Sequence, residues 1–219
     1  MMVSADDVKA GQAVYTKRTL RIYDWLVLGF SNRFIWQCPT RELLRHYNEC
    51  ITGNHLDVGV GTGYFLDRCK FPKDVPRVAL MDLNQDCLNA AAARISRYQP
   101  ESYQTNILDP IKLQIEPFDS IALNYVLHCL PGTMVTKAEV FQHLRQLLAS
   151  KGVLFGATIL HDGVSRGPVA RWLMNYYNAK QIFTNIDDDL NSLQEALQRQ
   201  FKHISLKTVG CVAIFSGHD

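Results

Sequence analysis

Three closely spaced glycines follow a short apolar run in the segment His55-Leu-Asp-Val-Gly-Val-Gly-Thr-Gly63. A loop with so few side chains lets backbone N–H groups and the start of the next helix approach a ligand closely. The acid in this segment, Asp57, comes two residues before the first glycine. Its carboxylate suits a cationic group and would repel a pyrophosphate. The segment therefore predicts a loop that binds a small molecule carrying a positive charge.

The glycine spacing separates this loop from a dinucleotide-binding fingerprint, which requires Gly-x-Gly-x-x-Gly. If the pattern starts at Gly59, the third glycine should be residue 64, which is Tyr64. If it starts at Gly61, the third glycine should be residue 66, which is Leu66. Both registers fail, so the spacing argues against a dehydrogenase.

A second acid ends the apolar run Val78-Ala-Leu-Met-Asp82, 19 residues after Gly63. A carboxylate at the end of a strand can accept hydrogen bonds from both hydroxyls of a ribose. An isolated Asp in this place would more readily be explained as a helix cap. The glycine loop upstream is what favours the ribose role for Asp82.

Together with two later segments, Tyr103–Asp109 and Phe118–His128, these motifs resemble class I S-adenosylmethionine (SAM)-dependent methyltransferases that act on small molecules. The resemblance covers about residues 54–160, with a tail to about residue 216. It implies an α/β fold with a Rossmann-like, mostly parallel sheet, an antiparallel C-terminal strand and a helical N-terminal cap. It also implies SAM as the cofactor. No metal requirement is expected, because no acidic or His/Cys cluster has convincing ligand spacing.

The resemblance places the methionine ammonium near Asp57 and the ribose on Asp82. Family members usually carry an Asp where this chain has Asn106, but an amide still offers an oxygen to the adenine amino group and a donor to a ring nitrogen. Asp109 is the second candidate for that role. An aromatic residue of the N-terminal segment, Tyr15 or Tyr23, should cover the SAM. The cofactor residues so predicted are Asp57, Gly59, Gly61, Gly63, Asp82, Leu83, Asn106, Ile107, Asn124, Tyr125 and Tyr23.

Methyl transfer from a sulfonium is an in-line displacement, so alignment and desolvation are most of the enzyme's work. A base is needed only if the acceptor must lose a proton. Two histidines lie beyond predicted strand ends, His128 and His161, and are the candidate catalytic residues. A structural role is the favoured interpretation for His128, whereas His161 follows the fifth strand and could line the acceptor pocket. His55 lies within a strand and is expected to be structural.

The elements that must position these residues alternate between strands and helices, which is typical of βαβ units and a parallel sheet covered on both faces. Gly29 is expected to end a helix over 14–28, and a second helix should begin near Pro39. An aspartate run at 187–189 should open a helix rather than bind a metal. The predicted strands are His55–Val60, Arg77–Asp82, Ser102–Asn106, Ser120–Tyr125, Val153–Ile159, Ile204–Val209 and Cys211–Phe215. The predicted helices of this region are Tyr64–Cys69, Gln85–Tyr98, Thr136–Ala149, Val169–Phe183 and Leu190–Phe201.

Two segments outside this alternation are rich in aromatic residues. Residues 1–53 are predicted to form a helical cap, and residues 54–219 the SAM-binding domain with a lid insertion at about 161–184. All three tryptophans, Trp25, Trp36 and Trp172, fall in the cap or the lid. Most of these rings should pack the helices onto the sheet. A few should face a cavity, since ligand pockets are mostly apolar and lined by aromatic side chains.

The overall composition limits the alternatives. The formal net charge is +2, from 23 basic and 21 acidic residues. The sequence contains no basic stripe of the kind that binds nucleic acid. The six cysteines are spread singly, and no uncharged apolar stretch reaches the roughly 18–20 residues of a membrane span. A cytoplasmic enzyme with a small-molecule acceptor is expected, and a homodimer is left open.

Two other functions compete with a small-molecule methyltransferase. Enzymes that methylate exocyclic amines of nucleobases carry an Asn/Asp-Pro-Pro-Tyr/Phe tetrad after the fourth strand, and this chain has Asn124-Tyr-Val-Leu there. A SAM-binding sensor or partner subunit without catalysis would carry the same glycine loop and acid. The motifs predict binding more directly than turnover, so this second alternative stays open.

Overall fold

The computed structural model describes residues 24–219, whose strands form one seven-stranded sheet in the order β3-β2-β1-β4-β5-β7-β6. β7 runs antiparallel to both of its neighbours, whereas the pairs among the first five strands are parallel. This confirms the predicted Rossmann-like, mostly parallel sheet with an antiparallel C-terminal strand. The strands are β1 (Asn54–Val58), β2 (Arg77–Asp82), β3 (Glu101–Gln104), β4 (Phe118–Asn124), β5 (Leu148–Ile159), β6 (His203–Val209) and β7 (Val212–His218).

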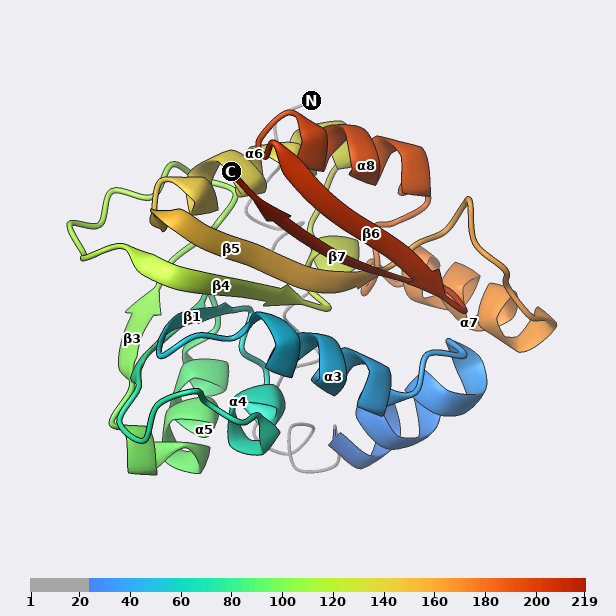
Figure 1. The fold of residues 1–219 in the computed structure, drawn as a ribbon. Coiled ribbons are helices and arrows are strands. Elements are labelled where there is room, and N and C mark those ends of the chain that lie inside the picture. Colours follow the sequence, from blue (N-terminus) through green and yellow to red (C-terminus); the bar gives the residue numbers. More distant parts are fainter. Residues whose placement is uncertain (1–23) are drawn as a thin grey trace.

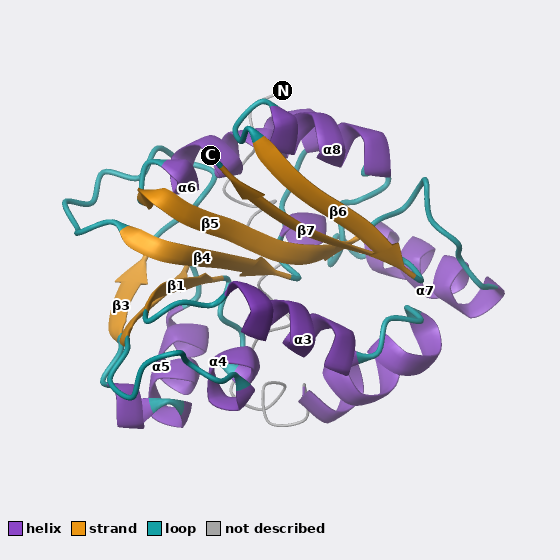
Figure 2. Cartoon of the chain, in the orientation of Figure 1, coloured by secondary structure: helices purple, strands orange, loops and turns teal. Residues whose placement is uncertain are grey.

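Helices cover both faces of this sheet (Figures 1 and 2). One face carries α3 (Thr40–Cys50), α4 (Tyr64–Arg68) and α5 (Gln85–Arg94), and the other carries α6 (Met134–Arg145) and α8 (Leu190–Gln198). The π-helix η1 (Asp24–Ile35), in blue, and α7 (Pro168–Ala179), in orange, lie at the same end of the sheet in Figure 1. Short 3₁₀ turns, η2 (Ser96–Tyr98) and η3 (Leu127–Cys129), complete the described part of the chain.

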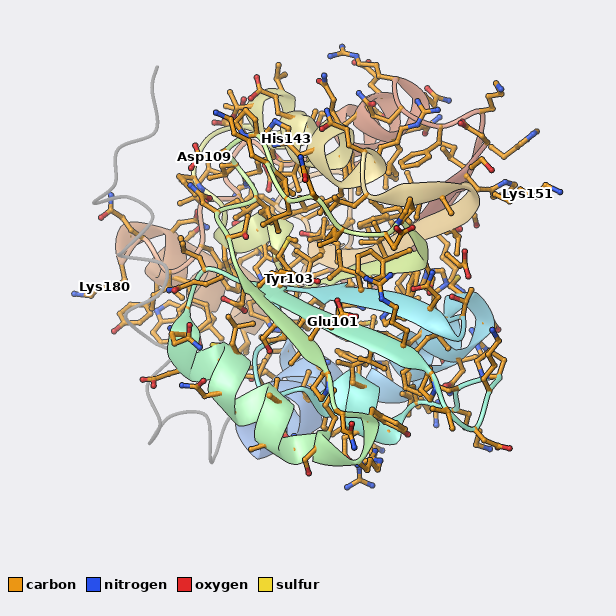
Figure 3. The ribbon with its side chains drawn as sticks, turned by 90° about the vertical axis from the view of Figure 1, so that its left-hand side faces the viewer. Glu101, Tyr103, Asp109, His143, Lys151 and Lys180 are labelled. Atoms are coloured by element: carbon orange, nitrogen blue, oxygen red, sulfur yellow. The ribbon has the colours of Figure 1, made fainter. Side chains whose placement is uncertain are left out.

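The position of each strand in the sheet explains its sequence. The residues of β1, β2 and β4 are buried almost throughout, as expected for strands covered on both faces. The edge strand β3 alternates between half-buried and exposed residues. Figure 3 looks onto this edge, where the Tyr103 hydroxyl donates to Glu101 and Arg77 binds the same carboxylate at 2.8 Å. Charged side chains of this kind discourage pairing with a further strand.

Two helix starts are fixed by side-chain caps. The Asn84 side chain accepts a hydrogen bond from the Asp86 N–H at the start of α5. Asp189 accepts from two N–H groups at the start of α8 and forms a capping box with Ser192. The prediction that the aspartate run opens a helix is therefore confirmed.

The prediction that Gly29 ends a helix is wrong. η1 runs through Gly29 to Ile35, and Gly29 has no positive φ that would turn the chain. The reversal comes at Gln37, whose φ is 56°, just before Pro39 and the start of α3. Residues 1–23, including Tyr15, Tyr23 and the first part of the helix expected over 14–28, lie outside the described residues.

The other predicted elements are present with shifted boundaries. α7 ends at Ala179 rather than Phe183, because the chain turns at Gln181 with a φ of 55°. β5 begins at Leu148, so the helix predicted over Thr136–Ala149 ends earlier than expected. Within residues 24–219, no helix is long and apolar enough to cross a bilayer.

Candidate active site

A cavity opens where β1, β2 and β4 end, at the edge of the sheet where open α/β folds bind ligands. The glycine loop forms one wall, and the segments after β3 and β4 form others. Gly63 does not line this cavity, and Tyr23 lies outside the described residues. The other predicted cofactor residues all line it: Asp57, Gly59, Gly61, Asp82, Leu83, Asn106, Ile107, Asn124 and Tyr125.

The three glycines of the loop meet different surroundings, although all have positive φ values, of 68°, 51° and 71° in order. A Cβ at Gly59 would come within 2.2 Å of the Val126 side chain. A Cβ at Gly63 would press on Ala91 of α5 at 3.0 Å, so this glycine permits close helix packing. A Cβ at Gly61 would meet no atom of residues 24–219 within 4 Å. Gly61 is thus the glycine whose missing side chain leaves open space in the cavity.

Asp57 lies at the end of β1, is only 6% exposed and lines the cavity. The Tyr47 hydroxyl of α3 donates to its Oδ2 at 2.6 Å. Burial raises the pKa of Asp57 to about 7, the Tyr47 hydrogen bond opposes this rise, and the nearby Asp82 adds to it. A cation in the cavity would favour the ionised carboxylate and would in turn be held by it.

Asp82 lies at the end of β2, where backbone N–H groups surround its carboxylate. The N–H of Asn84 donates to Oδ1 at 2.8 Å, and the N–H groups of Val60, Gly61 and Leu83 also hydrogen-bond the carboxylate. Burial raises the pKa of Asp82 to about 6 against the effect of these hydrogen bonds. The contacts to Val60 and Gly61 tie the acid directly to the glycine loop.

At the other end of the cavity, the backbone after β3 presents Asn106 and Ile107. Asn106 already uses its side chain locally, because Nδ2 donates to Asp109 at 2.8 Å and Oδ1 accepts from the Leu108 N–H at 3.2 Å. Asp109 does not line the cavity. The His143 ring of α6 bonds the Ile107 carbonyl at 2.9 Å, and Figure 3 labels both His143 and Asp109 beyond the β3 edge.

The end of β4 brings Asn124 and Tyr125 to the cavity beside Leu28 of η1. Asn124 Nδ2 is buried and has no hydrogen-bond partner among the described residues, so it can donate to a ligand. Tyr125 has a φ of 59°, an uncommon conformation for a residue other than glycine. Its hydroxyl donates to Asn32 of η1 at 2.9 Å, which joins the end of β4 to the N-terminal helix.

The two candidate catalytic histidines do not line this cavity. His128 is 3% exposed, and its Nδ1 accepts from the Ile159 N–H at 3.3 Å. Its ring centroid lies 4.5 Å from that of Phe183, and burial lowers the pKa of His128 to about 3. The ring is therefore neutral. His161 is also largely buried, and its Nδ1 lies 3.3 Å from an Asp162 oxygen without the alignment of a hydrogen bond.

A polar cluster that no sequence motif indicates joins η1 to the glycine loop. Thr62 of the loop donates to Asp24 Oδ1 at 2.5 Å, and Arg94 of α5 binds Asp24 Oδ2 at 2.5 Å. Arg94 also binds Asp67 of α4 at 3.0 Å. Asp24 and Arg94 are 70 residues apart in the chain, so only the folded structure brings them together.

Comparisons with known proteins agree with this geometry. Residues 56–154 match the family described as "Methyltransferase domain". The chain is 38% identical to demethylluteothin O-methyltransferase of Streptomyces thioluteus, over 94% of this chain and 89% of the relative. It is 36% identical to the physcion biosynthesis cluster O-methyltransferase of Aspergillus chevalieri, over 94% of this chain and 93% of the relative.

A solved structure has the same fold at low sequence identity. It is described as a DhpI–SAH complex, and it matches with a TM-score of 0.71 at 14% identity over 98% of this chain and 97% of the other. The sheet, the cavity at its carboxyl edge and the close relatives lead to one conclusion. The chain belongs to the class I SAM-dependent methyltransferases, and it transfers a methyl group to a small molecule.

The residues at the cavity fit the cofactor of this family. The open space at Gly61 admits backbone contact, two carboxylates face the cavity, and the unpartnered Asn124 amide offers a donor. When bound, SAM would supply a methyl group on a cationic sulfur. The methyl group would pass to the acceptor, with the sulfur as the leaving group. The contribution of the protein is to hold both partners in alignment and to exclude water.

Proposed function

We propose that this enzyme methylates a hydroxyl group of a small natural-product intermediate. Two curated relatives that match most of the chain are named O-methyltransferases. The observation that carries the proposal is the chemistry of the cavity lining at the end of β4, where the Asn124 amide and the Tyr125 phenol lie. These groups can orient an oxygen atom by hydrogen bonds.

We assign the cofactor by position within the cavity. Asp57 faces the methionine ammonium and Asp82 the ribose hydroxyls, while Gly59 and Gly61 let the ligand approach the loop. Leu83 and Ile107 pack on the adenine. Asn106 lines the cavity beside the adenine, and its side chain donates a hydrogen bond to Asp109.

Among the described residues, the cavity-lining side chains at the end of β4 can orient an oxygen but do not readily take a proton. The Tyr125 hydroxyl donates to Asn32, and an amide is not a base at neutral pH. The two cavity carboxylates are assigned to the cofactor, and His128 is neutral and buried behind the wall. We therefore propose that the acceptor hydroxyl is acidic enough to ionise by itself, as in an enol or an acidic phenol.

A panel of hydroxyl compounds tests this proposal. The compounds should be matched in size and range in hydroxyl pKa from about 5 to about 10, with a simple aliphatic alcohol as the last member. We expect turnover, followed by release of S-adenosylhomocysteine (SAH), to fall as the acceptor pKa rises above the assay pH. Equal turnover of the aliphatic alcohol would require a base in the protein and would contradict the proposal. SAH binding without turnover of any acceptor would favour the sensor alternative.

We further propose that the cap, residues 1–53, and the segment 161–184 together cover the acceptor site. Leu28 of η1 lines the cavity, and the Trp36 and Phe183 rings lie 5.8 Å apart, which brings the two segments into contact. The Thr184 N–H donates to the His128 carbonyl at 2.8 Å, behind the end of β4. A cytoplasmic location, a homodimer and the lack of a nucleic-acid partner stay predictions of the sequence.

A further inference from the structure

A chain of hydrogen-bonded polar groups, buried except for the half-buried Thr52, runs from the loop before β1 to the cofactor cavity. Its members are Thr52, Ser120, His55, Tyr47 and Asp57, contributed by β1, β4, α3 and the α3–β1 loop. The Thr52 N–H lies 3.0 Å from Ser120 Oγ, and Ser120 Oγ lies 2.8 Å from His55 Nδ1. His55 Nε2 lies 2.9 Å from the Tyr47 hydroxyl, which lies 2.6 Å from Asp57 Oδ2. Only Asp57, the last member, lines the cavity.

The proton inventory of these groups gives the chain one direction. Tyr47 has a single hydroxyl proton, and the ionised form of Asp57 can only accept, so with Asp57 charged that proton points to it. His55 must then donate to Tyr47 from Nε2 and accept at Nδ1. Ser120 donates its hydroxyl proton to that nitrogen and accepts from the Thr52 N–H. Burial lowers the pKa of His55 to about 3, so the ring is neutral, as this arrangement requires.

We infer that His55 is a positioning residue for the cofactor: it fixes the Tyr47 hydroxyl as a donor to Asp57 and keeps this carboxylate charged and turned toward the cavity. The inference rests on the proposed role of Asp57 in holding the methionine ammonium. Hydrogen bonds aligned head to tail polarise one another, so the donor at the end of the chain is stronger than an isolated phenol. Without the His55 donor, the Tyr47 hydroxyl could rotate away from Asp57.

Other groups packed around Asp57 do not supply this donor. Asp82 of β2 is a like charge and raises the pKa of Asp57. Cys69, at the end of α4, is a buried thiol whose own pKa is raised to about 12 by burial. The β4 residue paired with Asp57 is Ala122, which has no polar side chain. Among the described groups that act on the Asp57 carboxylate, Tyr47 is the side chain that stabilises its charged form.

Ligand binding to the full chain tests the inference with two probes. SAH carries the amino-acid ammonium, whereas 5′-methylthioadenosine has the same nucleoside but lacks the amino acid. In His55→Leu and Tyr47→Phe, we expect SAH affinity at pH 7 to fall about tenfold and methylthioadenosine affinity to stay within about twofold. His55→Gln keeps a donor toward Tyr47 and should recover most of the SAH affinity. Tyr98 packs against the same apolar cluster as Tyr47. Tyr98→Phe removes a hydroxyl there and is the matched control, which should bind both probes normally.

A titration gives a second readout that needs no ligand. In protein labelled with ¹³C at the aspartate carboxyl carbon, the pKa of Asp57 should be higher in Tyr47→Phe and His55→Leu than in the wild type. The loss of SAH affinity in both variants, relative to the wild type, should therefore become smaller as the pH is raised above 7. An unchanged Asp57 titration, or equal weakening of SAH and methylthioadenosine in His55→Leu, would overturn the inference. If the wild-type protein binds neither nucleoside, the cofactor assignment itself is what fails.

Discussion

Arg94 of α5 and Asp24 of η1 are joined by an ion pair of 2.5 Å between Nη1 and Oδ2. The side chains are 25% and 28% exposed, so the pair is neither deeply buried nor free in solvent. Because Thr62 of the glycine loop binds the same aspartate, the pair connects the cofactor loop to the N-terminal helix. These contacts hold the start of η1 against the glycine loop.

Replacing Arg94 with Gln should loosen η1 while leaving the sheet intact. We expect faster hydrogen exchange over residues 24–36 and an acceptor KM raised about three- to tenfold, with less than about 1 kcal/mol lost in the free energy of unfolding. Arg45→Gln removes the same charge from an exposed pair with Glu42 on α3 and is the control. Unchanged exchange over 24–36 in Arg94→Gln would show that the pair does not hold the helix.

Gly61 provides a direct test of the cofactor loop. We expect Gly61→Asn to lower SAM affinity at least about a hundredfold, because the new side chain enters the cavity. Asn tolerates positive φ better than other residues, and no atom lies within 4 Å of the added Cβ, so the ligand-free melting temperature should change little. Calorimetric titration with SAM and a thermal melt measure the two quantities. Normal SAM affinity in this variant would remove the loop from the cofactor site.

The pH dependence of SAH binding should report on Asp57. Burial raises its pKa to about 7, and only the ionised carboxylate attracts an ammonium group. SAH affinity should therefore approach its full value near pH 8, about one unit above this pKa, and should fall as the pH drops through 7 toward 6. Asp57→Asn should bind SAH weakly and without this dependence, and methylthioadenosine should not show it in the wild type. A wild-type SAH affinity that is flat from pH 6 to 8 would refute this assignment.

Lys137 of α6 and Asp188, just before α8, form a fully buried ion pair of 2.7 Å. Lys137→Met should cost about 3–5 kcal/mol in the free energy of unfolding, since it leaves the buried aspartate uncompensated. The double change Lys137→Met with Asp188→Asn should recover part of this loss. Urea unfolding measures both.

The loss of unfolding free energy in Lys137→Met should depend on pH because Asp188 titrates. Burial raises the pKa of Asp188 to about 6 in the wild type, and loss of Lys137 should raise it further. An aspartate with a raised folded-state pKa destabilises the protein above that pKa and is relieved by protonation below it. The deficit should therefore be larger at pH 8 than at pH 5.5. A deficit that grows as the pH falls would contradict this account.

Features that depend on short spacing along the chain can be predicted from the amino-acid sequence. The positions of Gly59 and Gly61 after an apolar run, and of Asp82 at the end of the next one, follow from the strand–loop–helix order. In a parallel sheet this order brings strand ends to one edge, so the cavity could be predicted without knowing the packing. The helix start at Asp189 was likewise readable, because a cap acts on N–H groups within three residues.

Contacts between side chains that are distant in the sequence depend on the tertiary packing. Tyr47 donates to Asp57, and Arg94 binds Asp24, because α3 and η1 pack against the sheet and the loop in a particular way that no local pattern encodes. The same packing buries His128 behind the cavity wall, where desolvation keeps its ring neutral. Gly29 continues a helix because the chain reverses only at Gln37. Charge state and contact partner depend on burial, and burial is a property of the whole fold.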